Sequence, residues 1–215
     1  MNTRLQVEHP VAEAVTGLDL VALQIYIAQG APPGIVQGAP PGIVQADFAL
    51  SGHAIDARLH AEDPGRGGGP SAGPVALWRP PGAHRADAGI AAHRADAGIA
   101  AHRVDVGIAA GGEVSARHDP MVAKPIARAP TREEARRRLI AALRGTAPIG
   151  PDSGAAFLIE RLEASGFAAG RATADWLVAR WPGRRAPRSC ARAASFAGPA
   201  PRRGAARRAA RARGA

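Results

Sequence analysis

Side chains that can bind anions and move protons are concentrated at the start of the chain, in the run MNTRLQVEHP. The polar members of this run occupy alternate positions: Asn2, Arg4, Gln6 and Glu8. On an extended strand they would all point to one face, with Leu5 and Val7 on the opposite, buried face. A guanidinium can hold a small planar anion through two parallel hydrogen bonds, and a carboxylate can accept its proton. The pattern predicts an anion site with Glu8 as the base. An exposed polar edge with a salt bridge is the alternative interpretation.

The run that follows predicts helical structure. Pro10 suits a first helical position, and apolar residues recur at helical spacing up to Gly30, which would end the run. Because Gly17 interrupts the pattern, we expect one or two helices with a break near this residue.

The clearest helix signal covers residues 131–144. Thr131 is placed to cap it, Glu134 to complete a capping box, and Gly145 to end it. The apolar stripe consists of Ala135, Leu139, Ala142 and Leu143, and the arginines at 136–138 are expected on a solvated face. Further helices are expected over residues 154–164 and 173–180.

Short strands are expected between residues 48 and 127, where alternating segments are punctuated by Gly and Pro. In one of them Ile55 and Ala57 alternate with Asp56 and Arg58, which places the polar pair on the opposite face. Helices, then strands, then helices along the chain indicate the α+β class.

Two tandem repeats interrupt this pattern. The octapeptide GAPPGIVQ occurs at 30–37 and 38–45, and the nonapeptide AHRADAGIA occurs at 83–91 and 92–100, with a diverged copy, AHRVDVGIA, at 101–109. Periods of eight and nine residues are too short for helical-pair solenoids. We interpret both repeats as local duplications within a loop or hairpin.

The formal charge of +10 is unevenly distributed. Ten of the 28 basic residues are arginines in the segment 184–215, and all 18 acidic residues precede residue 176, so the rest of the chain is neutral. The composition of the tail predicts disorder, with nucleic-acid binding as an alternative role.

A single cysteine excludes a disulfide framework, and the apolar stretches are shorter than the ~20 residues of a membrane span.

Four segments resemble the biotin carboxylase family, the ATP-dependent component of acyl-CoA and pyruvate carboxylases. They are MNTRLQVEHPVAEAVTGLDLV at the start, GHAIDARLHAEDP at 52–64, GGEVSARHDPMVAKPI at 111–126, and TREEARRRLIAALRG at 131–145. The segments follow the order of the family. Removal of one GAPPGIVQ copy also restores the separation that the family has between Arg4 and Arg58.

The resemblance implies roles for individual residues. Glu8 would deprotonate bicarbonate, which then attacks ATP to give carboxyphosphate. Arg4, with Gln6 and the backbone of Val7, would hold the bicarbonate, and these residues would form the substrate and cofactor site together with Asn2. Asn2 would lie beside the magnesium ions and the nucleotide phosphates. Arg58 would face the ureido oxygen of biotin and stabilise the charge that develops there.

The resemblance also implies the organisation of the chain. Residues 1–47 would be the end of an ATP-grasp domain, residues 48–181 the biotin carboxylase C-terminal domain (an antiparallel sheet with flanking helices, with the repeat insertion at 83–109), and residues 182–215 a disordered tail. Most of the ATP-grasp domain and the biotin-accepting Ala-Met-Lys-Met motif are absent from this sequence. Arg117 and His118 replace two tyrosines of the family, and Pro125 enters a run expected to be a strand.

The family is an ATP-dependent ligase that uses Mg²⁺ or Mn²⁺ and carries biotin as a bound substrate. We expect no tight binding of these groups, and no turnover, by this chain alone. Expected partners are bicarbonate, biotin, the biotin carrier and carboxyltransferase components and a second copy of the chain, in the cytoplasm and without a membrane. Two alternatives stay open: a non-catalytic partial gene product that keeps an association domain, and a nucleic-acid binder that uses the Arg-rich tail.

Overall fold

The structure is a computed structural model, and it describes residues 4–30, 49–63, 68–79, 102–173, 175–176, 179 and 195–197. Five helices are described: α1 His9–Thr16, α2 Leu20–Ala28, α3 Arg132–Arg144, α4 Ala155–Glu163 and α5 Ser165–Ala168. The strands of the main sheet are β1 His53–Asp56, β2 Leu59–His60, β7 His102–Val106, β9 Met121–Ala129 and β11 Ser195–Ala197. Three antiparallel pairs flank it: β3 Glu62–Asp63 with β4 Gly69–Pro70, β5 Gly73–Pro74 with β8 Glu113–Val114, and β6 Leu77–Arg79 with β10 Ala147–Ile149.

The main sheet is built around β9, and every pairing in it is antiparallel. One edge of β9 pairs first with β2 and then with β1, while the other edge pairs with β7. β11 extends the sheet beyond β1. The predicted antiparallel sheet with flanking helices is therefore confirmed.

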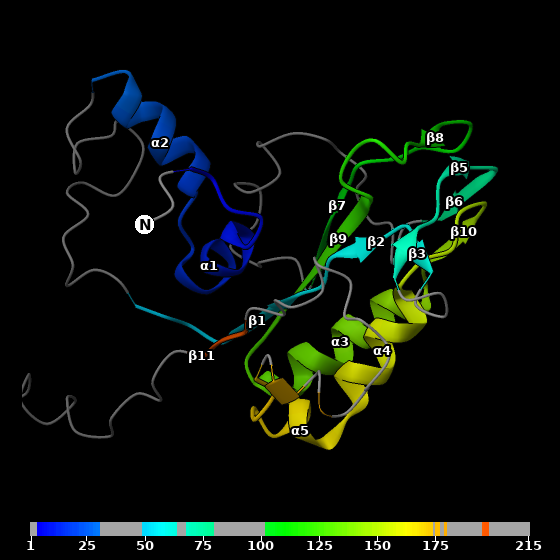
Figure 1. The fold of residues 1–215 in the computed structure, drawn as a ribbon. Helices are drawn as coiled ribbons and strands as arrows, with labels where there is room; N and C mark the ends of the chain where they lie inside the picture. Colours follow the sequence, from blue (N-terminus) through cyan, green and yellow to red (C-terminus); the bar gives the residue numbers. More distant parts are fainter. Residues whose placement is uncertain are drawn as a thin grey trace, which may run out of the picture.

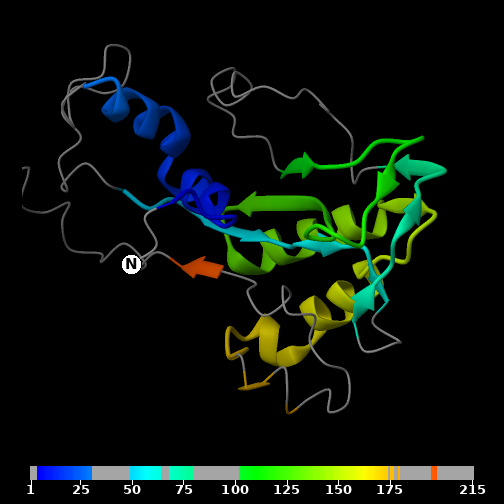
Figure 2. The same cartoon turned by 45° about the horizontal axis from the view of Figure 1, so that its top comes forward.

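Helices cover both faces of this sheet (Figures 1 and 2). Ala54 packs with Val11 and Val15 of α1, whereas Ile55 packs with α3 on the other face. Neighbouring residues of a strand point to opposite faces, so the alternation predicted for this segment is confirmed. α4 packs in turn against α3.

The sequence around Gly52 fixes the start of β1. Gly52 has a φ of +72°, and a Cβ atom at this position would lie 2.6 Å from the backbone oxygen of Ala129. Only glycine combines that conformation with such a close approach, so β1 begins tightly against the end of β9.

The predicted helices are confirmed where the structure describes them. The break near Gly17 separates α1 from α2, and Thr131 caps α3 by accepting a hydrogen bond from the Glu134 amide at 3.2 Å. Two of the three arginines predicted on a solvated face of α3 differ from that prediction, whereas Arg137 is exposed as expected. Arg136 donates to the Leu162 carbonyl at 2.8 Å and Arg138 to the Arg128 carbonyl at 2.9 Å, because long side chains at the rim of α3 reach the backbone of α4 and β9.

α2 is the least packed helix, and none of its residues is buried. No single described helix is long and apolar enough to cross a membrane. α1 and α2 together have enough length and apolar residues for a span, but the two helices meet at an angle of 101°.

Several predictions fall on residues outside the described ranges. These are both octapeptide copies beyond Gly30, the first two nonapeptide copies and most of the segments 173–180 and 182–215. His102–Val106 of the third nonapeptide copy form β7, and Ser195–Ala197 of the predicted disordered tail form β11.

Candidate functional site

The structure brings together two of the residues predicted to carry chemistry. A terminal nitrogen (Nη2) of Arg58 lies 2.7 Å from Oε1 of Glu8, although the two residues are far apart in sequence. Both side chains are mostly buried, with exposed fractions of 17% for Arg58 and 19% for Glu8. This ion pair lies at the α1 side of the main sheet, where β1 ends.

The N-terminal run differs from the predicted strand. Among the described residues of this run, 4–8 form a bend and a turn, and Leu5 is exposed rather than buried. The cause is local: Pro10 starts α1, and Glu8 precedes it with helical backbone angles and accepts a hydrogen bond from the Val11 amide at 3.0 Å. A chain that already turns at Glu8 cannot present alternate side chains on one strand face.

The other predicted site residues are placed differently from one another. Arg4 is exposed and donates to the backbone oxygen of Leu5 at 3.4 Å, so the structure does not group it with the ion pair. The Gln6 backbone oxygen accepts from Nδ1 of His9 at 2.7 Å, and the Val7 backbone oxygen accepts from Nζ of Lys124 at 2.9 Å. Asn2, predicted for the metal and the nucleotide, lies outside the described residues.

Arg58 lies in a break of the sheet edge. β1 ends at Asp56 and β2 begins at Leu59, and the pairing register against β9 shifts between Leu59 and His60. The break lies beside Pro125 of β9, whose carbonyl accepts from the Ala57 amide at 3.0 Å and which has no N–H to continue the ladder. The proline that departs from the family pattern is therefore accommodated where the partner strand is interrupted, and Arg58 projects from that interruption.

His60 supports the same segment. Its side chain is buried, and its Nδ1 lies 3.1 Å from the backbone oxygen of Arg58. Burial lowers the pKa of His60, so the neutral imidazole is favoured at neutral pH. A neutral ring with Nδ1–H facing the carbonyl fixes the backbone of Arg58 without adding charge.

A layer of charged side chains extends from this ion pair beneath α1. Nζ of Lys124 lies 3.0 Å from Oδ2 of Asp105, Nε of Arg103 lies 2.6 Å from Oδ1 of Asp105, and Nη1 of Arg103 lies 3.5 Å from Oε2 of Glu13. Burial pushes the pKa of Asp105 upward, but the Arg103 hydrogen bond and the charge of Lys124 hold it below its usual value. Lys124 thus ties β7 and β9 to the backbone that carries Glu8.

Sequence reasoning missed Lys124 and Asp105. A signal was present, since Lys124 is the single lysine of the chain and lies within the apolar run of β9. A lysine is rarely buried without a partner, so its position indicated a carboxylate or carbonyl nearby.

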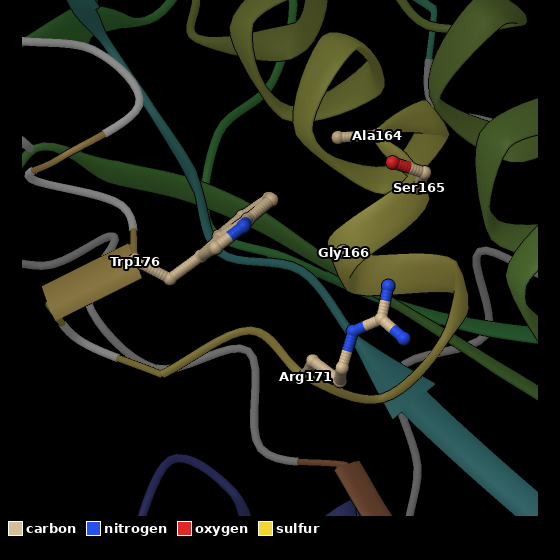
Figure 3. Close-up of a pocket in the computed structure, with 5 residues that line it drawn as sticks. All are labelled: Ala164, Ser165, Gly166, Arg171 and Trp176. Carbon is tan, nitrogen blue, oxygen red and sulfur yellow. The ribbon is translucent and has the colours of Figure 1, made fainter.

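A separate small pocket lies on the α3 side of the molecule, lined by Ala164, Ser165, Gly166, Arg171 and Trp176. Figure 3 shows the Trp176 ring directed toward α5, and a Cβ atom at Gly166 would lie 2.5 Å from its indole nitrogen. Within the described part of the chain, no group of three or more His, Cys, Asp or Glu side chains is arranged to hold a metal ion.

Comparisons with known families match two stretches of the chain. Residues 56–179 match the model of the biotin carboxylase C-terminal domain. Residues 1–34 match the model of the carbamoyl-phosphate synthase L chain, ATP binding domain. The first stretch contains Arg58 and the second contains Glu8.

Individual relatives agree with this match. The chain is 38% identical over 186 residues to the propionyl-CoA carboxylase alpha chain of Ruegeria pomeroyi, which covers 85% of this chain and 26% of that protein. The biotin carboxylase subunit of pyruvate carboxylase superimposes with a TM-score of 0.68 at 36% identity, covering 83% of this chain and 34% of that one. The biotin carboxylase domain of a thermophilic 2-oxoglutarate carboxylase bound to bicarbonate gives a TM-score of 0.68 at 31% identity, covering 83% and 35%. The chain spans about a quarter to a third of the length of these relatives.

Proposed function

The chain belongs to the biotin carboxylase family, and on this premise we propose that it forms one wall of a site for the ATP- and bicarbonate-dependent carboxylation of biotin. The observation that supports the proposal is the Glu8–Arg58 contact of 2.7 Å. It joins the end of the segment similar to an ATP-binding domain to the start of the segment similar to a biotin carboxylase C-terminal domain. A solved relative is described as bound to bicarbonate, which is the anion that the proposed base would act on.

Glu8 would act as the general base. An ion pair requires its carboxylate to be ionised, which is the form that can accept the hydroxyl proton of bicarbonate. The proton would pass to a Glu8 oxygen, and the resulting carbonate dianion would become the nucleophile toward the terminal phosphate of ATP, forming carboxyphosphate with ADP as the leaving group. Arg4, Gln6 and the Val7 backbone remain the proposed bicarbonate-binding groups.

Arg58 would act on biotin. Carboxyphosphate would break down to CO2 and phosphate, and the phosphate would take the proton of a ureido nitrogen of biotin, so that negative charge develops on the ureido oxygen before that nitrogen attacks CO2. A guanidinium in a mostly buried position stabilises such charge more strongly than it would in water. Because Glu8 holds a terminal nitrogen of Arg58, this pair would have to open before the terminal nitrogens can face biotin.

Magnesium and the nucleotide are left outside this scheme. The described residues show no cluster of metal ligands, and Asn2, the proposed neighbour of the metal, is outside them. The described residues therefore supply a base (Glu8), a cation that stabilises negative charge (Arg58) and the sheet that positions them. In the proposed scheme, other parts of the family's site position the phosphates. We propose no turnover by this chain alone, and we propose the biotin carrier and carboxyltransferase components as its partners.

The proposal is tested by titration of the full ¹⁵N-labelled chain with free biotin, followed by NMR. We expect weak binding, with a Kd in about the millimolar range, that shifts the Arg58 side-chain signal and the amides of β1 and β2. Arg58→Gln should abolish the shifts. Arg117→Gln, at an exposed arginine of the segment before β9, is the matched control and should leave them unchanged. Shifts confined to other regions, or equal shifts in Arg58→Gln, would contradict the proposal.

A further inference from the structure

The charged layer beneath α1 contains one carboxylate more than it has cations. Its carboxylates are Glu8, Glu13, Asp56 and Asp105, and its cations are Arg58, Arg103 and Lys124. Three of the carboxylates lie within ion-pair distance of a cation, at 2.6 to 3.5 Å. Among the described residues, Asp56 has no such contact, and the proposed function gives it no role.

Asp56 is fully enclosed. It is 1% exposed, and neither carboxylate oxygen accepts a hydrogen bond from another described residue. Burial raises the pKa of Asp56 to about 6; the charges of Lys124 and Arg58 work against this rise, and the charge of Glu8 adds to it. A buried carboxylate that accepts no hydrogen bond from another residue is costly, and groups with such perturbed pKa values are concentrated at functional sites.

Arg58 has a complementary unused donor. Its Nη2 pairs with Glu8, but its Nε is buried and has no acceptor among the described residues. Asp56 precedes Arg58 by two positions, on the α1 side of the strand, because the intervening Ala57 packs into the core with α3. Two positions along a strand span about 7 Å, which a long arginine side chain can bridge by a change of rotamer. The unsatisfied donor and the unsatisfied acceptor therefore lie within reach of each other.

Resting on the proposed function, we propose that Asp56 is a positioning residue, the second carboxylate partner of Arg58, which holds the guanidinium through Nε when Glu8 turns to bicarbonate. Glu8 cannot accept a proton and remain a charged partner of Arg58. A second carboxylate keeps Arg58 in place through that step and leaves its terminal nitrogens free for biotin. No covalent bond changes in this exchange, since only the hydrogen-bond partner of Arg58 is replaced.

The groups around Asp56 set the pH above which its carboxylate is charged and can pair with Arg58. Lys124 of β9, Arg58 at the end of β1 and Glu8 before α1 act on it directly. Asp105 and Arg103 of β7, with Glu13 and His9 of α1, complete the layer through their contacts with Lys124 and with one another. Above the midpoint of its titration, Asp56 is charged and can pair with Arg58. Loss of the Glu8 charge moves that midpoint to lower pH, so Asp56 becomes available when Glu8 is neutral.

NMR of the full, isotope-labelled chain tests this exchange without any ligand. The measured quantities are the Asp56 carboxyl ¹³C shift against pH and the ¹⁵N heteronuclear NOE of Arg58 Nε, which reports side-chain order. In the wild type we expect a midpoint near 6. In Glu8→Gln the midpoint should fall by about half a pH unit or more, with Arg58 still ordered above the midpoint and disordered below it. In Glu8→Gln with Asp56→Asn, Arg58 should be disordered at every pH.

Glu13→Gln is the matched control, because Glu13 belongs to the same helix and the same layer but pairs with Arg103. It should change neither the Asp56 midpoint nor the order of Arg58. The inference would be overturned if the titration midpoint of Asp56 were the same in Glu8→Gln as in the wild type. It would also be overturned if the Arg58 side chain were still ordered in the double variant. If Asp56→Asn does not fold, the pH titration of Glu8→Gln alone decides the question, since loss of Arg58 order must then follow protonation of Asp56.

The outcome separates this inference from the proposed function. If biotin shifts the NMR signal of Arg58 but the Asp56 midpoint does not change in Glu8→Gln, Asp56 is not the second partner of Arg58 and the proposed function stands. If Asp56 responds as expected but biotin never reaches Arg58, the proposed function fails and the carboxylate exchange is left as a property of the fold.

Discussion

The two faces of the main sheet carry different kinds of side chain. The face under α3 is apolar: Ile55, Ala57 and Ala127 pack with Leu139 and Phe167, and the ion pairs of α3 lie at its rim. The face under α1 has a small apolar cluster of Val11, Val15 and Ala54, and next to it the seven charged groups of the layer around Arg58. Burying charge costs stability, whereas burying apolar surface supplies it. The α3 face therefore supplies most of the stability of the fold, and the buried charges of the α1 face cost part of it.

The strongest test of this division removes apolar volume from the α3 face. Leu139 is fully buried, so Leu139→Ala should lower the free energy of unfolding by about 2 to 5 kcal/mol. Ile27→Ala on α2 is the control; Ile27 is 50% exposed, and its loss should cost less than about 0.5 kcal/mol. Urea unfolding of the full chain measures both, and equal losses would mean that α3 does not cover the principal core.

The second test removes charge from the α1 face, where we expect a gain. Asp56 binds its proton more tightly in the folded chain, with a pKa of about 6 against 3.8, so its contribution to stability falls as pH rises through this window. Asp56→Asn cannot ionise. Relative to the wild type it should gain about 3 kcal/mol between pH 4 and pH 7.5, an upper value that follows from a shift of about two pKa units.

Asp105→Asn is the matched control for that experiment because the sign reverses. Its cationic partners hold the pKa of Asp105 below the usual value, so the ionised carboxylate stabilises the fold above that usual value, and the contribution is lost as pH falls. Asp105→Asn should therefore become more destabilising as pH rises. Thermal unfolding at a series of pH values separates the two variants, and parallel pH profiles would contradict the account of the charged layer.

A smaller effect is expected at β7, which lies at the edge of both regions. Val104 and Val106 distinguish the third nonapeptide copy from the first two, which carry alanine at these positions. Valine favours strands, and Val104 also packs against the core cluster around Leu59. The double substitution Val104→Ala with Val106→Ala should cost about 1 to 3 kcal/mol in urea unfolding, most of it at Val104 because Val106 is 40% exposed. No measurable cost would show that the diverged valines do not stabilise β7.

Local patterns predicted the apolar face well. The Thr131 cap and the stripe of α3, the break at Gly17 and the alternation of Ile55 with Asp56 are encoded within short windows, and each has its expected counterpart in the structure. Ile140 was missed because it lies beside the stripe that the spacing defined, yet it is buried in the same core.

The charged face was harder to predict because its contacts join segments distant in sequence. The Lys124 contacts with Val7 and Asp105 depend on how α1, β7 and β9 meet, which no short window contains. The predicted strand at residues 2–8 was wrong for 4–8 because alternation of polar residues carries no information on whether a neighbouring strand exists to pair with them. Asp56 alternated as a polar residue should, but α1 covers the face to which it points. The roles of Arg4, Gln6 and Asn2 stay predictions.

We propose that the Glu8–Arg58 pair must open before biotin can reach the guanidinium of Arg58. The affinity of the full chain for free biotin, measured by NMR titration in the wild type and in Glu8→Gln, tests this directly. We expect Glu8→Gln to bind biotin about threefold to tenfold more tightly, because loss of a charge-assisted hydrogen bond frees the terminal nitrogens of Arg58 for the ureido oxygen. Unchanged or weaker binding by Glu8→Gln would contradict it.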